Sequence, residues 1–137
     1  MKDAELSFWD AVDAIRGRGG RYRREAYGFV MGALGYTVQR LPAERLSDPE
    51  RRHLSGGELV DGVVALARRE FGVLAPTVFR EWGVATGEDV GRIVFELVEA
   101  GHLSARPEDR LDDFLGASDL MERLAGDLEL GRGPTRA

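Results

Sequence analysis

The sequence predicts a mainly α-helical fold, and three observations support this class. Apolar residues recur at the three- and four-residue spacing of amphipathic helices through most of the chain. Glycines end several of these segments, and at two starts a Ser or Thr stands three residues before an acidic residue. The 137 residues, 43% of them hydrophobic, are enough for one core. We therefore expect a single domain over residues 1–130 and a flexible tail over 131–137.

Two helices are predicted to form a hairpin over residues 7–41. The first spans 7–16, with Ser7 as its N-cap and the glycines of "RGRGG" at its end. The second spans 22–41 and carries two apolar stripes, which implies burial on more than one side.

Three glycines, Gly28, Gly32 and Gly35, are spaced along one face of the second helix. Each destabilises a helix interior by about 1 kcal/mol relative to alanine. Close approach of a second backbone would compensate this loss. We expect the glycine face to pack against another helix, in the same chain or in a second copy of it.

A polar linker over 42–53 precedes three further helices with clear start and stop signals. Capping boxes predict the first turn of two of them, and a proline stands in the first turn of the other. The predicted starts are at Ser55, near Pro76 and at Thr86, and the predicted ends are at Gly72, Gly83 and Gly101.

The pattern of apolar residues changes after Gly101, where "HLSARPEDRLDDFL" has short apolar runs around a turn signal. A β-hairpin there would turn Leu103 and either Leu111 or Phe114 toward the core. A last amphipathic helix is expected around the leucines of "LMERLAGDL". Three helices followed by a leucine-rich helix end, "LVEAG", and a hairpin resemble a winged helix over residues 55–115.

Four stretches of the chain resemble a family of small uncharacterised bacterial proteins, the Minf family. They are "FWDAV", "RYRREAY", "HLSGGELVDG" and "EDVGRIVFELVEAG". The resemblance brings no assigned activity and no catalytic residues. In the family pattern, larger residues are usual where Gly32 and Gly35 stand here.

Charge is unevenly distributed along the chain, whose formal net charge is -5. Residues 16–53 carry nine arginines against four acids, whereas residues 54–137 carry nine arginines against sixteen acids. Such asymmetry indicates either a basic surface for an external anion or two parts of the fold that face each other.

Three of these arginines, Arg21, Arg23 and Arg24, stand at the predicted start of the second helix, where the helix dipole disfavours cations. Anionic groups should therefore compensate them. Carboxylates of the chain or of a partner protein are the favoured candidates, and phosphate is the alternative, because guanidinium groups and helix N-terminal N–H groups both bind it. The fifth-helix segment is acidic, with Arg92 alone against four acids, which argues against DNA reading through that helix.

Enzymatic chemistry has little support in the sequence. The chain has no cysteine, which excludes disulfides, thiolate metal sites and cysteine nucleophiles. Glu99 and His102 have a metal-site spacing, but such sites need a second copy on a facing helix. "GRGG" lacks the context of a phosphate loop. We expect no cofactor and no metal site.

The function predicted from the sequence is a non-enzymatic interaction module that joins a macromolecular assembly through the second helix. Its contact residues would be the three arginines with Gly28, Gly32, Trp9 and Trp82, where the tryptophans serve as core or interface anchors. The alternative is binding of RNA or DNA backbone through residues 16–53. A protein partner or self-association is expected, without a membrane, since the longest uncharged run is shorter than the roughly 20 residues of a membrane span. The absence of an export signal predicts a cytoplasmic location.

Overall fold

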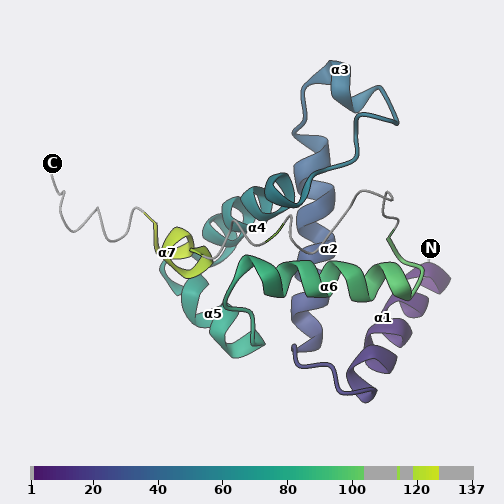
Figure 1. Ribbon diagram of the computed structural model, residues 1–137, viewed down its shortest axis with the longest axis vertical. Helices are drawn as coiled ribbons and strands as arrows, with labels where there is room; N and C mark the ends of the chain where they lie inside the picture. The colour runs from purple at the N-terminus through teal and green to yellow at the C-terminus, as the bar shows by residue number, and fades with distance from the viewer. Residues whose placement is uncertain (1, 104–113, 115–118, 127–137) are drawn as a thin grey trace, which may run out of the picture.

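The computed structural model describes residues 2–103, 114 and 119–126, and these residues are mainly helical. Helix α2, Arg24–Gln39, runs along the long axis of the molecule (Figure 1). Helices α1, α4, α5 and α6 pack against it. Their bounds are Lys2–Gly17 for α1, Gly56–Phe71 for α4, Ala75–Trp82 for α5 and Gly87–Glu99 for α6. The prediction of a mainly α-helical fold is confirmed.

Two short helices complete the described fold. Helix α3, Ala43–Leu46, projects beyond the end of α2 and lies within the stretch predicted as a linker (Figure 1). Helix α7, Leu120–Ala125, packs against α4 and α5 and buries both of its leucines. A 3₁₀ turn, Gly72–Leu74, joins α4 to α5.

Local signals explain where the middle helices begin. Ser55 and Thr86 each accept a hydrogen bond from the backbone N–H three residues later, and the acid at that position bonds back to the cap. These are the two capping boxes that the sequence predicts. The acid in each box also has a distant partner: Glu58 pairs with Arg45, and Asp89 accepts a hydrogen bond from Tyr22. The caps therefore connect α4 and α6 to the segments that flank α2.

Helix ends follow the glycines. Gly83, with φ of 87°, caps α5 in the left-handed region, and Gly101, with φ of 83°, follows the end of α6. The backbone N–H of His102 donates to the Leu97 carbonyl at 2.9 Å, so the chain turns sharply away from α6. No strand occurs among the described residues, and most of the segment predicted as a β-hairpin, 104–113, lies outside them. Phe114 is described, and it is buried with its ring 6.2 Å from that of Phe95.

The boundaries of the first two helices differ from the predicted ones, most clearly at their starts. The first helix begins at Lys2 rather than Ser7, because "KDAEL" has good helix formers and acids that suit a helix N-terminus. The second helix begins at Arg24 rather than Tyr22, since Tyr22 belongs to the preceding loop and turns inward, where it is 2% exposed.

The core lies where α2, α4 and α6 meet, and α2 and α4 are in close contact at Gly62 of α4. A Cβ at this position would lie 1.7 Å from the Thr37 hydroxyl oxygen of α2. That hydroxyl donates to the Ala33 carbonyl at 2.7 Å, which fixes its rotamer. Only glycine at position 62 therefore permits this packing. The buried apolar residues of the three helices include Ala26, Tyr27, Val30, Ala33, Leu59, Val60, Val63, Val90, Ile93 and Leu97.

Candidate functional site

The arginines at the start of α2, predicted as a contact surface, lie close to carboxylates of the same chain. Arg24 Nε donates to Asp13 of α1 at 3.0 Å, and the Arg24 guanidinium carbon lies 4.5 Å from the centroid of the Trp9 ring. Arg23 lies 3.8 Å from Glu81 of α5. Arg21 is exposed, 6.0 Å from the Tyr22 ring, and forms no ion pair within the described residues. Two of the three arginines thus connect α2 to neighbouring helices.

The glycine face of α2 is not uniform. A Cβ at Gly28 would lie 2.8 Å from the Trp9 ring, so this glycine admits the tryptophan against the helix. Gly32 and Gly35 are exposed, and a Cβ at either would meet no described atom within 4 Å. Gly28 therefore packs against Trp9 of α1, whereas Gly32 and Gly35 meet no other described helix of the chain. Packing of these two glycines against a second copy stays a prediction.

The two tryptophans are anchors of the fold. Trp9 lies between α1 and α2, beneath Arg24 and Gly28. Trp82 closes a cluster with Phe29, Phe71 and Phe79, in which its ring centroid lies between 5.3 and 5.8 Å from the other three. Aromatic pairs at these separations add about 0.5–1.5 kcal/mol beyond the burial of their surface.

A second arginine surface lies at the other end of α2, and sequence reasoning missed it. The guanidinium carbon of Arg40 lies 5.0 Å from the centroid of the Tyr36 ring, and that of Arg69, from α4, lies 5.9 Å from the same centroid. We call these three residues the Tyr36 cluster. Both arginines are exposed, and neither forms an ion pair in the described part of the chain. Among the residues that the structure describes, the cluster therefore has two exposed arginines that no carboxylate pairs with.

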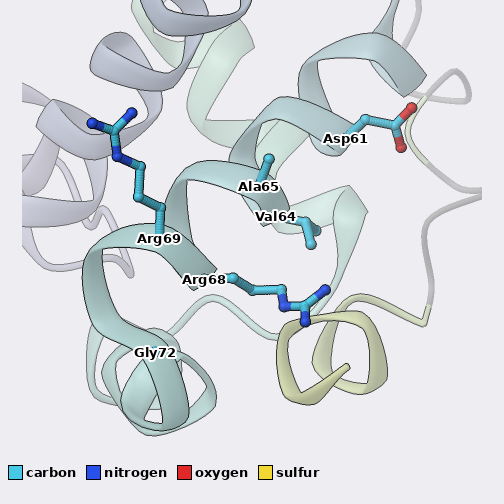
Figure 2. Close-up of a pocket in the computed structure, with 6 residues that line it drawn as sticks. All are labelled: Asp61, Val64, Ala65, Arg68, Arg69 and Gly72. Carbon is cyan, nitrogen blue, oxygen red and sulfur yellow. The ribbon is translucent and has the colours of Figure 1, made fainter. Parts of the chain in front are cut away.

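Two adjoining hollows extend along α4 beside the Tyr36 cluster. The smaller, of about 290 Å³, lies between α2 and α4 and includes Tyr36 and Arg40 in its lining. The larger, of about 520 Å³, includes Val64, Arg68 and Arg69. Figure 2 shows Arg69 and Arg68 leaving α4 in different directions, with Arg68 toward α7. Asp61 and Ala65 line both hollows, which therefore adjoin at these residues; we call the two hollows together the α4 groove.

The acidic residues of the α4 groove already have cationic partners. Asp61 accepts a hydrogen bond from Arg123 of α7 at 2.6 Å, and Glu58 accepts one from Arg45 at 2.6 Å. The hydrogen bond from Arg45 holds the pKa of the Glu58 carboxyl below its usual range. Within the described part of the chain, the two arginines of the Tyr36 cluster are therefore the charges at this groove that have no ion-pair partner.

Part of this site was visible in the sequence. Tyr36 and Arg40 stand four residues apart in a predicted helix, which places them on one face. Arg69 comes from another helix, and no local pattern connects it to Tyr36.

Among the described residues, no group of three or more His, Asp and Glu side chains is placed to hold a metal ion. His102 instead packs its ring edge-to-face on Phe8, 5.6 Å between centroids. No described helix has both the length and the apolar character needed to cross a membrane.

Comparison with known proteins identifies no relative. No family model matches the chain, and neither a curated protein nor a solved structure matches it. The resemblance to the Minf family remains a prediction from the sequence, and the function has to be argued from the surface described above.

Proposed function

We propose that the chain is a non-enzymatic interaction module that joins a macromolecular assembly through the α2 region and an arginine patch. The observation that carries this proposal is the Tyr36 cluster, where two helices hold two uncompensated arginines against one ring beside a groove. The patch thus lies at the end of α2, whereas the arginines at its start mainly serve the fold.

The exposed glycines of α2 support the same surface. Gly32 and Gly35 precede the Tyr36 cluster on the helix, and a Cβ at either position would meet no described atom outside its own helix backbone and chain neighbours within 4 Å. A partner backbone could approach the helix closely there. A partner that lies along α2 would contact both the glycines and the cluster.

The alternative function is binding of a nucleic-acid backbone through residues 16–53. Within this range Arg23 and Arg24 face Glu81 and Asp13, which leaves fewer cations for phosphate. Affinity for nucleic acid depends on the number of phosphates that Lys and Arg neutralise. A protein partner is therefore the favoured candidate.

The winged-helix-like arrangement of residues 55–115 belongs to the same proposal. In this proposal its three helices would be α4, α5 and α6, and the acidic first turn of α6 suits protein contacts better than DNA. Winged helices serve both purposes, so this likeness alone does not decide the function.

Co-purification of the tagged chain from its native cells, with and without nuclease, tests the proposal. We expect a protein partner that survives nuclease treatment and is lost from Gly32→Gln/Gly35→Gln, which adds bulk to the exposed face of α2. Ala14→Gln, at an exposed position of α1, is the matched control and should retain the partner. Loss of all partners on nuclease treatment would favour nucleic-acid binding, and an unchanged set of partners in the glycine variant would contradict the assigned surface.

A further inference from the structure

We propose that the Tyr36 cluster and the α4 groove form a binding site for a carboxylate-rich peptide segment of a partner protein. This inference rests on the interaction-module function and assigns the chemistry of its partner.

The positive charge of the Tyr36 cluster favours binding of an anion. The chain has 24 acidic and 19 basic side chains among Lys, Arg, Asp and Glu, yet Arg40 and Arg69 approach one ring and form no ion pair with the described carboxylates. An anion beside the ring would be attracted by both positive charges. Arginine suits a carboxylate because its planar fork donates two parallel hydrogen bonds to the two oxygens.

The Tyr36 ring prepares the two arginines for such a ligand. A guanidinium group held at an aromatic ring samples fewer rotamers than a free one, so less side-chain entropy is lost when the ligand binds. The ring itself is half-buried, and its helix is fixed by the contact between Thr37 and Gly62. The arginines are therefore positioned by the α2–α4 interface.

The shape of the groove favours a peptide over a small anion. Its two hollows share Asp61 and Ala65 and continue along α4 as far as Gly72. Leu41, Val64 and Ala65 supply apolar lining beside the charges. A segment with acidic side chains on one side and apolar side chains beside them would occupy both parts.

The same lining disfavours nucleic acid. Glu58 and Asp61 line the groove, and the Asp61 side chain remains 69% exposed even when paired with Arg123. A phosphate backbone along the groove would run past these carboxylates, and the net charge of -5 repels a polyanion elsewhere. A peptide avoids this repulsion by presenting acids only at the Tyr36 cluster.

Fluorescence anisotropy of the full chain with three labelled probes tests the inference. The first probe is a helical peptide with glutamates at i and i+4 and leucines beside them. The second has glutamine for each glutamate, and the third is a single-stranded RNA of similar length. At an ionic strength of about 0.15 M, we expect binding of the glutamate peptide that is at least roughly tenfold tighter than binding of the other two.

Matched variants locate the binding. Arg40→Gln/Arg69→Gln should lose at least roughly tenfold in affinity for the glutamate peptide. Arg18→Gln/Arg21→Gln, which removes the same charge from the loop between α1 and α2, should bind the peptide as the parent does. Arg40→Lys/Arg69→Lys keeps the positive charges but lacks the planar guanidinium groups, so its affinity for the glutamate peptide should lie between those of the parent and the glutamine variant. Circular dichroism and thermal unfolding of each variant confirm that it is folded.

Three outcomes would overturn the inference. They are equal binding of the glutamate and glutamine peptides, an equal loss in the control variant, and preferred binding of RNA that disappears in Arg40→Gln/Arg69→Gln. A protein partner lost from the glycine variant, combined with no preference for glutamate, would reject the carboxylate chemistry and leave the interaction module intact.

Discussion

The two ends of α2 carry arginine clusters of different kinds. At the start, Arg23 and Arg24 face carboxylates from α5 and α1, and Trp9 lies beneath Arg24. At the end, Arg40 and Arg69 lie at a tyrosine ring and form no ion pair with a described carboxylate. The first cluster is dense in the sequence, and the second forms only when α2 and α4 pack. Density of arginines along the chain therefore did not identify the open cluster.

The same contrast appears in the glycines. Gly28, near the start of α2, accommodates Trp9, whereas Gly32 and Gly35 are exposed. At the far end, the close approach is made by Gly62 of α4 against Thr37 of α2. Helix α1 thus covers the start of α2, and α4 covers one side of its other end.

The largest expected effect is at the α2–α4 contact. Gly62→Leu should lower the free energy of unfolding by about 3 kcal/mol or more, because its Cβ would overlap the Thr37 hydroxyl. Urea denaturation monitored by circular dichroism measures the change. Thr37→Ala in the same chain should recover part of the loss. Gly32→Ala, the control with open space around its Cβ, should raise stability by up to about 1 kcal/mol.

At the start of α2, Gly28→Leu should be less destabilising, by about 1–3 kcal/mol, since the neighbouring Trp9 is half-buried and has some room to move. The same denaturation experiment applies, with sedimentation to detect any change in assembly. A variant that melts and sediments like the parent would show that Trp9 does not pack against this face.

Tyr27→Phe probes the buried polar connection between α2 and α6. The Tyr27 hydroxyl donates to Glu96 at 2.6 Å, and its loss should destabilise the fold by about 1–3 kcal/mol at neutral pH. Burial, and then the hydrogen bond to Glu96, raise the pKa of Tyr27 in the folded chain. The parent should therefore lose stability as the pH rises above about 10, the pKa of an unfolded tyrosine.

The alkaline loss should be shallower in Tyr27→Phe than in the parent, because one titrating group has been removed. Tyr22, whose pKa is raised by burial and by Asp89, remains in both. Unfolding free energies measured at several pH values on either side of 10 check the slope. Parallel curves for the two chains would contradict the assigned role of Tyr27.

The smallest effect on stability is expected for the arginines at the start of α2. Arg24→Gln should lower stability by about 0.5–1 kcal/mol through loss of the exposed pair with Asp13 and of the contact with Trp9. Thermal unfolding at low and high salt measures this loss of stability. The difference in stability between the variant and the parent should become smaller as the salt concentration rises. A difference that does not depend on salt would assign the effect to packing on Trp9 alone.

Local chemistry made much of this fold predictable. Ser55 with Glu58, Thr86 with Asp89, and Gly83 define helix ends through contacts within a few residues, and the structure has each of them. The contact of Gly62 with Thr37 and that of Arg69 with Tyr36 join different helices. Neither leaves a pattern along the chain, since each depends on how α2 and α4 cross. For the same reason the outward direction of Gly32 and Gly35 was not predicted.

The most direct test follows the arginine side chains themselves by NMR during a titration with the glutamate peptide. Substitution of Arg24, Arg40 and Arg69 by lysine, one at a time, assigns their Nε–H signals. The Arg24 Nε–H, already donated to Asp13, should keep its position, and those of Arg40 and Arg69 should shift together and saturate. A shift of Arg24 without any response from Arg40 and Arg69 would contradict the division of α2 into a closed and an open end.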